Sequence, residues 1–275
     1  MADAVLTLAL DEATGPSVDS EPGGTLEAEL QQQQIETDTK PCECLSDLAV
    51  QVRAARTHAD RLAARAGGRV VALGTSPLPT SPEVTAKRPY LAMIEHYGLV
   101  TLDQLTCGCH VHVAVDSPDE GVGVLDRIRV WLPTLLALSA NSPFWQGQDS
   151  GYASFRSVAW NRFPTAGPCD VFGSAAGYTA LVDALVGSRV ALDDGMIYFD
   201  ARLSARYPTV EVRIADVCLD ADDTVLLAAL TRALVETAAQ EWRWGTPAPP
   251  MATSLLRAAA CEPRGRVSTP SCSTR

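Results

Sequence analysis

The order in which helical and strand-like stretches follow one another constrains the fold of this chain more than any other feature. Apolar residues recur at helical spacing over 46–66, and two glycines follow that stretch and end it. A second helix, rich in Leu and Ala, is predicted over 222–240, with Asp220 or Asp222 as its N-cap. Around these helices, strands and helices do not alternate strictly, which favours an α+β fold over a doubly wound sheet.

The remaining elements are predicted from shorter patterns. Helices are expected over 122–140, where Pro133 should kink or break the chain, and over 178–186. The proline-rich segment 77–89 and the Gly-, Pro- and Ser-rich segment 141–176 are interpreted as loops, the second of them functional. Strands are expected at Val5 to Leu10, Arg69 to Gly74, Gly108 to Asp116, Met196 to Leu203 and Thr209 to Ile214.

Charge and hydropathy exclude several classes of function. The 275 residues carry 33 acidic and 22 basic side chains, a formal net charge of -11, which repels nucleic-acid phosphates and anionic membranes. No apolar run approaches the roughly 20 residues that a membrane-spanning helix needs, and the start lacks the basic region of a signal peptide. We therefore expect a cytoplasmic protein without nucleic-acid or membrane partners, whose eight cysteines are reduced.

The segment Cys107–His112 carries two histidines on a predicted strand. Because strand residues alternate between faces, His110 and His112 share a face with Gly108, while both cysteines lie on the other. The four metal-binding side chains therefore cannot converge on one ion. A half-buried strand with two polar residues is the plain alternative, but two histidines beside a glycine fit the wall of a substrate site better.

A second polar strand is predicted at Thr209 to Ile214. Alternation places Thr209, Glu211 and Arg213 on one face and Val or Ile on the other. The apolar face should pack, and the polar face should line a cavity or face water. Taken alone, Glu211 and Arg213 are more simply interpreted as a solvated ion pair of little energetic value.

Two further segments are ambiguous when each is taken alone. Glu29 to Glu36 resembles a polar helix end or a low-complexity run of glutamines, and we interpret it as solvated. Ser154 to Pro164 combines Arg156 and Arg162 with aromatic residues, which suits either a carboxylate- or phosphate-binding pocket or a packed loop. The chain has no Walker-type phosphate loop, Rossmann fingerprint or nucleophile-elbow serine motif, so any nucleotide chemistry needs another scaffold.

Together and in this order, five motifs resemble the glutamate-cysteine ligase 2 family of carboxylate-amine ligases. The resemblance covers residues 6 to 260 and implies the fold of glutamine synthetase, an antiparallel sheet that forms a curved active-site wall with helices packed outside. The motifs are Glu29–Glu36 for Glu-x-x-x-x-Gln-[Val/Ile]-Glu, Gly74–Pro77 for Gly-Thr-x-Pro, Cys107–His112 for Cys-Gly-x-His-Val-His, Ser154–Pro164 for Ser-x-Arg-Ser with Trp-x-Arg-x-Pro, and Thr209–Asp216 for Thr-Val-Glu-Val-Arg-x-x-Asp.

By this resemblance, the chain is an ATP-dependent ligase that joins the γ-carboxylate of glutamate to the amine of cysteine through an acyl phosphate. Because the reaction brings a carboxylate to a polyphosphate, Mg²⁺ held by carboxylates has to neutralise the phosphates. Another amine acceptor and a homodimer are both compatible with the sequence. The resemblance implies metal ligands at Glu29, Glu36 and Glu211, catalytic contacts from His110, Arg156 and Arg213, and substrate contacts from His112 and Arg162.

Both ends depart from the family's pattern. Leu10–Gly15 matches Leu-Val-Asp-x-x-Thr-Gly, but Ala2–Leu6 stands where the family has Gly-Val-Glu-Glu-Glu, and only Asp3 is acidic there. We expect weak or absent activity, an incomplete catalytic domain at 1–260 and a disordered tail at 261–275. Deleting one base from a GC-rich coding string for the family's continuation, Trp-Arg-Ala-Ala-Arg-x-Gly-Leu, reproduces this tail, and a frameshift is our hypothesis for its origin.

Two rival interpretations remain open at this point. A chain without the acidic strand could be a non-catalytic remnant that binds an amino acid or a nucleotide. The other rival to the ligase is a metal-dependent hydrolase built around His110 and His112. Phosphate release that needs ATP, glutamate and an amine favours the ligase, binding without turnover favours the remnant, and hydrolysis without ATP favours the hydrolase.

Overall fold

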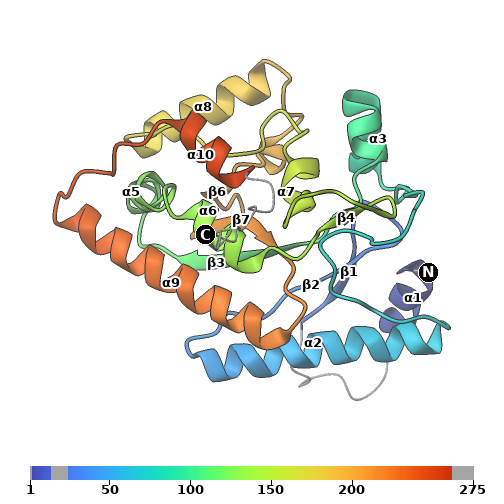
Figure 1. Ribbon diagram of the computed structural model, residues 1–275. Helices are drawn as coiled ribbons and strands as arrows, with labels where there is room; N and C mark the ends of the chain where they lie inside the picture. The colour runs from blue at the N-terminus through green and yellow to red at the C-terminus, as the bar shows by residue number, and fades with distance from the viewer. Residues whose placement is uncertain (1, 14–23, 262–275) are drawn as a thin grey trace, which may run out of the picture.

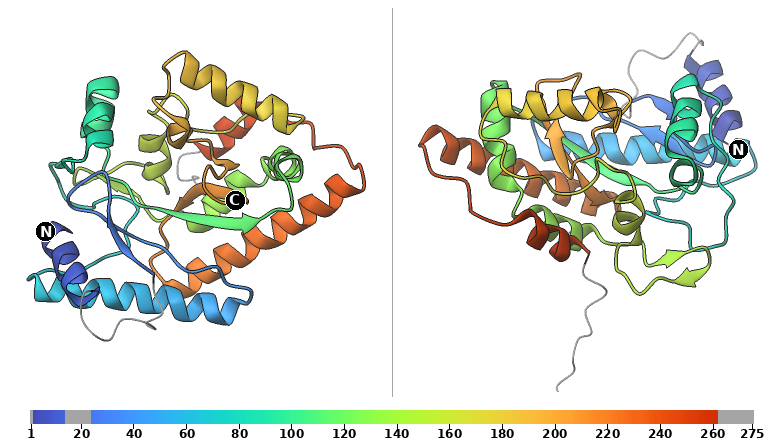
Figure 2. Two further views of the ribbon diagram at one scale, coloured as in Figure 1. Left: turned by 180° about the vertical axis from the view of Figure 1, so that it is seen from behind. Right: turned by 90° about the horizontal axis from the view of Figure 1, so that it is seen from above.

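The centre of the structure is a three-stranded antiparallel sheet with the strand order β3-β7-β6 (Figure 1). The computed structural model describes residues 2–13 and 24–261, and in it β3 spans Gly108–Ala114, β7 Thr209–Asp216 and β6 Ala201–Leu203. The long helix α9 packs on β3 and α2 packs on α9, whereas α8 lies on the other side of the sheet (Figure 2). This mixture of helices and antiparallel strands confirms the α+β class.

Alternation along β7 separates apolar from polar side chains, as the sequence predicts. The apolar face enters the main core, where α5 and α9 pack against the sheet. In the register between β3 and β7, His112 stands opposite Glu211, after one register shift earlier in β3. The two polar strands are therefore neighbours in one sheet. The buried apolar residues of β7 are Val210, Val212, Ile214 and Ala215, each exposed by 5% or less.

The long helices begin and end close to their predicted limits. α2 spans Leu45–Arg65 and α9 spans Ala221–Arg243. Asp220 is the N-cap of α9, because its carboxylate accepts a hydrogen bond from the backbone N–H of Asp222 at 2.8 Å. The shorter helix predicted over 178–186 is also present, as α8 (Ala175–Gly187).

The helix predicted over 122–140 is divided into α5 (Pro118–Ile128) and α6 (Leu132–Ser139). Pro133 lies in the first turn of α6, where its missing N–H removes no helical hydrogen bond. The break therefore precedes the proline instead of being centred on it.

The strand predicted at Val5 to Leu10 is wrong, because this segment belongs to the helix α1 (Ala2–Ala13). Val5 is buried with Leu62 and Ala63 in a small second core between α1 and α2. A short apolar run does not distinguish a strand from a buried helix by periodicity alone. Packing on α2 decides between the two.

The polar helix end predicted at Glu29 to Glu36 is also wrong. This segment connects β1 (Leu26–Ala28) to β2 (Ile35–Thr37), which pair antiparallel. Gln31 and Gln34 are buried and not solvated, since their side-chain amides donate to backbone carbonyls at 3.0 and 2.7 Å. Partners about 70 residues away satisfy these amides, and local composition does not reveal such partners.

Other parts of the chain differ from the prediction in detail. Residues 69–74 form no strand, and only the isolated bridge of Thr75 with Thr106 follows them. The strand predicted at 196–203 is shortened to β6, after the 3-10 helix η1 (Asp194–Met196). The loop predicted over 141–176 contains three short elements. They are β4 (Phe144–Trp145), β5 (Gln148–Asp149) and α7 (Phe155–Trp160). Three helices elsewhere in the chain were also not predicted, namely α3 (Arg88–Tyr97), α4 (Leu99–Leu102) and α10 (Thr253–Ala260).

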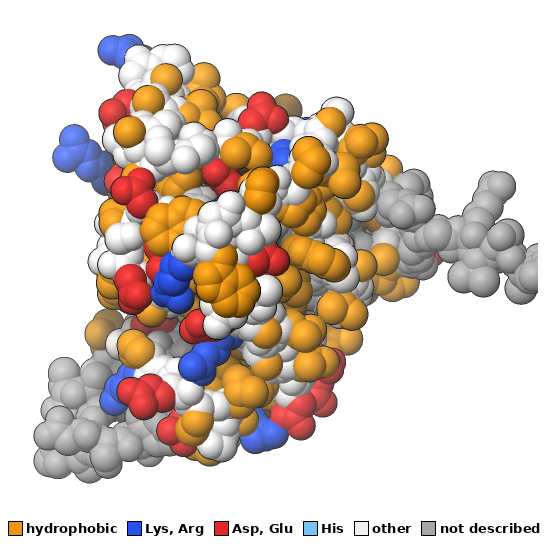
Figure 3. Space-filling model, turned by 90° about the vertical axis from the view of Figure 1, so that its left-hand side faces the viewer, with side chains coloured by type: hydrophobic (Ala, Val, Ile, Leu, Met, Phe, Trp, Pro, Cys, Tyr) orange, Lys and Arg blue, Asp and Glu red, His pale blue; other side chains and the backbone are white. Residues whose placement is uncertain are grey.

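The tail predicted at 261–275 lies outside the described residues except for Cys261, as do the turn residues 14–23. Large apolar side chains remain exposed on the described surface, including Trp131 at the start of α6, Leu138 on α6 and Leu255 on α10. Figure 3 shows apolar atoms spread across one face of the molecule. Within the described residues, no helix combines the length and the apolar character that crossing a membrane requires.

Candidate functional site

The polar face of the central sheet brings four predicted site residues together, with Arg213, His110 and His112 around the carboxylate of Glu211. Arg213 donates a hydrogen bond to Oε1 of Glu211. His110 Nδ1 and His112 Nε2 lie 3.6 and 3.9 Å from the same oxygen. Arg202, on β6, donates from Nε to Oε2 at 2.7 Å. The interpretation of Glu211 and Arg213 as a solvated ion pair is wrong, because Glu211 is only 3% exposed.

Charge compensation controls the protonation of this cluster. Burial alone would raise the pKa of Glu211, but the positive charges of Arg213 and Arg202 outweigh it and hold that pKa below its usual value. Burial lowers the pKa of His110 well below its usual value even though 29% of its side chain is exposed, and Arg213 lowers it further. Burial also lowers the pKa of His112. Near neutral pH the cluster therefore contains an ionised glutamate and two neutral histidines.

The β1–β2 hairpin supplies two more carboxylates next to Arg213. Glu29 is half-buried, and burial raises its pKa while the charges of Arg213 and Lys87 oppose that rise. Glu36 stands opposite Glu27 in the strand register. The Glu36 residue is exposed, yet desolvation by the surrounding hairpin raises its pKa to about 7, and the negative charges of Glu29 and Glu27 add to the effect. The hairpin thus concentrates negative charge that Arg213 and Lys87 only partly balance.

We expect the Glu36 carboxyl to titrate near pH 7 in metal-free buffer, measured by carbon-detected NMR of the side chain. Because the folded state holds this proton more tightly than the unfolded chain, the group's contribution to stability falls as pH rises from about 4.5 to about 7. Glu29→Gln should lower the midpoint, since it removes a neighbouring negative charge, whereas the exposed control Glu236→Gln on α9 should not. A midpoint near 4.5 in the parent chain would contradict the expectation.

Arg156 is buried against strands β3 and β7 and is only 3% exposed. It lies in α7, where Ser154 is the N-cap and accepts a hydrogen bond from Ser157. Its guanidinium donates to the backbone carbonyls of Ile214 and Arg213 at 3.1 and 3.2 Å. These contacts fix the course of β7, so contact between Arg156 and a substrate stays a prediction.

Gly108 provides the space that Arg156 occupies. A Cβ atom at Gly108 would lie 2.2 Å from Nη2 of Arg156, which no packing adjustment of the buried arginine easily relieves. The glycine beside the two histidines was expected to make room for a substrate. The room it makes is filled by a side chain from α7.

Arg162 lies apart from the Glu211 cluster, with 34% of its side chain exposed. Its Nη2 donates to Oε1 of Gln104 at 3.2 Å, and its Nη1 lies 3.8 Å from the carboxylate of Asp103. Its guanidinium also lies 5.6 Å from the ring centre of Trp145, within cation–π range. A substrate contact from Arg162 stays a prediction.

Sequence reasoning missed two residues that organise this region. Arg202 is the second arginine on Glu211, and the hairpin formed by two predicted strands, 196–203 and 209–214, was the signal that could have found it. Asp216 was noted only as the end of a motif. It is fully buried and lies 3.8 Å from Nη1 of Arg156.

Metal-binding chemistry is only partly assembled. Among residues 2–13 and 24–261, no group of three or more His, Cys, Asp or Glu side chains is arranged to hold a metal ion. Mg²⁺ in nucleotide sites, however, usually binds one or two protein carboxylates together with waters and phosphates. Glu29 and Glu36 fit that smaller donor set. Glu211 fits it less well, because two arginines already bind both of its oxygens.

Comparison with known proteins identifies the chain's relatives. The profile of glutamate-cysteine ligase family 2 matches residues 5–264. A relative from Paenarthrobacter aurescens is 52% identical over 259 residues, 94% of this chain and 67% of the relative. A second, from Streptomyces avermitilis, is 55% identical over 234 residues, 85% of this chain and 65% of the relative.

Both relatives carry the name "Putative glutamate-cysteine ligase 2-1". A third, from Streptomyces coelicolor, is 54% identical over 85% of this chain and 64% of its own length. The chain thus spans about two thirds of the length of the curated relatives it matches. On the extent of the profile match and this level of identity, the chain belongs to glutamate-cysteine ligase family 2.

Proposed function

We propose that this chain is an ATP-dependent carboxylate-amine ligase that joins the γ-carboxylate of glutamate to the amine of cysteine through an acyl phosphate. The observation that carries the proposal is the polar face of the central sheet, where Arg202 and Arg213 bind Glu211 beside two histidines. Guanidinium groups suit phosphate and carboxylate oxygens. Family membership supports the reaction class.

The same proposal extends to the fold and the substrates. We propose a glutamine synthetase-like arrangement in which the β3-β7-β6 sheet is the wall of the active site. Its ligands would be small molecules: ATP, glutamate, and cysteine or another amine. The net negative charge of the chain disfavours nucleic acid as a partner.

Mg²⁺ would be held by Glu29 and Glu36 on the β1–β2 hairpin. When bound there, the ion would neutralise phosphate charge so that a carboxylate can approach the γ-phosphoryl group. Metal coordination by Glu211, which the family resemblance implies, would use the lone pairs of its oxygens that Arg213 and Arg202 leave free. Glu211 also orients both guanidinium groups.

The remaining residues act by position and charge. Arg213 is placed to hold the negative charge that develops on a transferred phosphoryl group. His110 is neutral near pH 7, so it can hydrogen-bond to a substrate without adding charge to the site. Arg156 would support Arg213 through the backbone carbonyl of Arg213, to which it donates a hydrogen bond. Holding the acyl phosphate and the amine in line needs no covalent nucleophile from the enzyme.

The test is phosphate release by the purified chain with Mg-ATP, glutamate and cysteine, each omitted in turn, together with detection of the dipeptide. We expect weak release that depends on all components, in keeping with the altered acidic segment at the start of the chain. Arg213→Lys should lower kcat by about 100-fold, because an ammonium group cannot replace a two-pronged guanidinium contact. Arg206→Lys, on the exposed turn between β6 and β7, is the matched control and should retain activity.

Three other outcomes would overturn the proposal. Nucleotide or amino-acid binding without turnover would identify a binding remnant. ATP hydrolysis at a rate that does not depend on glutamate would identify a simple nucleotidase. Metal-dependent hydrolysis without ATP would identify a hydrolase built on His110 and His112.

A further inference from the structure

The guanidinium of Arg213 is buried, but its hydrogen bonds account for only part of its surroundings. Nη1 donates to Oε1 of Glu211 and lies 3.5 Å from Nδ1 of His110. Nε is buried and has no hydrogen-bond partner among the described residues. A planar fork that is held at one nitrogen can still turn about that contact. The direction of its plane therefore depends on the other groups that face it.

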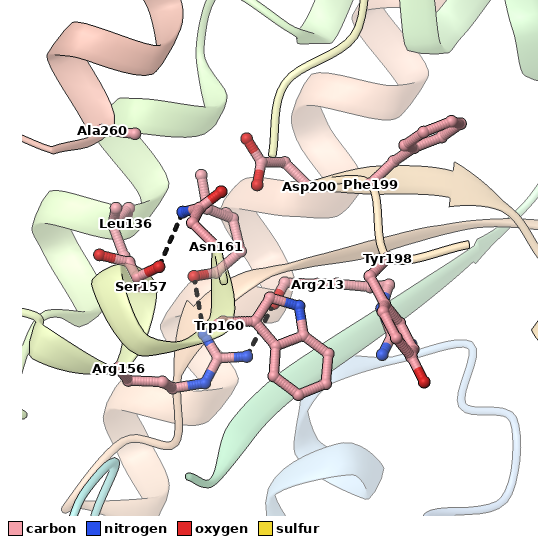
Figure 4. A pocket seen from close by; sticks show the side chains of 11 residues that line it. Leu136, Arg156, Ser157, Trp160, Asn161, Tyr198, Phe199, Asp200, Arg213 and Ala260 are labelled. Carbon is pink, nitrogen blue, oxygen red and sulfur yellow. Dashed lines mark hydrogen bonds between the residues drawn. The ribbon is translucent and has the colours of Figure 1, made fainter. Parts of the chain in front are cut away.

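Two aromatic rings face this guanidinium (Figure 4). Its central carbon lies 6.0 Å from the ring centre of Trp160 and 5.9 Å from that of Tyr198. Each distance is at the outer end of the range for cation–π attraction, about 6 Å, but both rings act on the same cation. Arg213 and Tyr198 are each only 8% exposed, so little water competes with these contacts. The rings thus give the cation a joint, electron-rich surface.

The two rings are themselves firmly held. Trp160, the last residue of α7, packs edge-to-face on Tyr198 with the ring centres 5.0 Å apart. The ring of Phe163 lies 5.4 Å from Trp160 and 5.1 Å from Tyr198. The backbone N–H of Tyr198 donates to the hydroxyl of Thr165 at 3.2 Å, and that hydroxyl donates to the backbone carbonyl of Met196 at 2.7 Å. A surface fixed in this way can orient the cation that lies on it.

Trp160 is also in contact with a second arginine. The central guanidinium carbon of Arg156 lies 5.9 Å from the ring centre of Trp160, and Figure 4 shows the indole between Arg156 and Arg213. Hydrogen bonds to two backbone carbonyls of β7 fix Arg156. The indole is therefore anchored by Arg156 as well as by its aromatic neighbours.

We propose that Trp160 and Tyr198 form an aromatic platform that fixes the plane of the Arg213 guanidinium, and that both are positioning residues of the ligase reaction. Donors whose direction is set before the reaction stabilise developing phosphoryl charge without reorganising. The platform depends on the two rings and not on the hydroxyl of Tyr198. The catalytic part rests on the proposed ligase function, whereas the immobilisation of Arg213 does not.

NMR relaxation of the Arg213 side chain tests the platform without any need for catalytic activity. The Nε–H resonance is assigned by its loss in Arg213→Lys. We expect an order parameter of about 0.85, the value of a rigid backbone. Trp160→Leu and Tyr198→Leu should each lower it below about 0.6, whereas Trp160→Phe and Tyr198→Phe keep a ring and should leave it high.

Two results of this measurement would overturn the proposal. Unchanged order in both leucine variants would show that Glu211 alone fixes the guanidinium. A mobile Nε–H in the parent chain would show that no platform exists, even if a leucine variant fails to fold.

Steady-state kinetics of the same four variants tests the positioning role. We expect kcat to fall about tenfold in each leucine variant while KM for ATP, glutamate and cysteine stays within about twofold, because the rings act on Arg213 and not on a substrate. Both phenylalanine variants should keep kcat within about twofold of the parent value. A loss in Tyr198→Phe as large as that in Tyr198→Leu would assign the role to the hydroxyl and refute the platform.

Phe172→Leu is the matched control, because Phe172 belongs to another ring pair of the same core and packs edge-to-face on Tyr178 at 5.0 Å. It should lower the midpoint of a thermal melt but change neither kcat nor the order parameter of Arg213. If Phe172→Leu lowers both, the leucine variants report general loosening of the core, and the proposal fails. If the parent chain has no ligase activity, the proposed function fails, and the order parameters still decide whether the platform exists.

Discussion

Asp216→Ala is expected to destabilise the chain by about 3–5 kcal/mol, the usual effect of removing one partner of a buried ion pair. Asp216 is fully buried and lies 3.8 Å from the buried guanidinium of Arg156. It also accepts hydrogen bonds from the hydroxyls of Ser142 and Ser154 at 2.7 and 2.8 Å. The backbone N–H of Asn141 donates to it at 3.0 Å. The substitution strands these donors together with a buried positive charge.

Urea unfolding followed by circular dichroism measures this loss as a lower midpoint with an unchanged slope. Asp183→Ala, an exposed position on α8, is the matched control and should change the free energy of unfolding by less than about 0.5 kcal/mol. A loss below about 1 kcal/mol for Asp216→Ala would mean that the serines and Arg156 find other partners.

Glu211→Gln is expected to destabilise the chain by about 3 kcal/mol, because two arginines would lose the negative charge that compensates them. Arg213 is 8% exposed and Glu211 3%, so water screens this cluster weakly. The variant should also lose ligase activity, since both guanidinium groups would be released from their present orientation.

The pH dependence of stability separates this effect from a packing defect. The pKa of Glu211 is lower in the folded state than in the unfolded chain. Its stabilisation is therefore present above about pH 4.5, the value of the free side chain, and is lost as pH falls below it. The difference between the parent chain and Glu211→Gln should shrink in acid. The control Glu236→Gln, exposed on α9, should have the same free energy of unfolding as the parent at every pH. If the difference between Glu211→Gln and the parent does not change with pH, the cause is a packing defect.

Several elements of the fold were predictable because their signals are local. The helical spacing of 46–66 and of 222–240 is a property of neighbouring residues, and α2 and α9 follow it closely. The same holds for alternation along β7, which separates Glu211 and Arg213 from the apolar residues of the core. The order of the five motifs indicated the family, and the profile match confirms that family.

Local signals failed where a distant contact chooses between two conformations. Val5 to Leu10 is compatible with a strand or a buried helix, and packing against α2 selects the helix. The glutamine-rich turn appeared solvated because the carbonyls that its amides bind lie about 70 residues away. Arg202 was overlooked because the register between β6 and β7 does not follow from a loop of this length.

By itself, the sequence determined the α+β class, the polar faces of β3 and β7 and the family, because spacing, alternation and motif order are all carried by the chain as written. Only the tertiary structure decided that Glu211 is shared by two arginines and that Arg156 fills the space left by Gly108. Those arrangements depend on side chains that meet across the fold. Arg156, for example, binds a backbone carbonyl 57 residues further along the chain, and burial, charge and hydrogen bonding there become definite only once the core has closed.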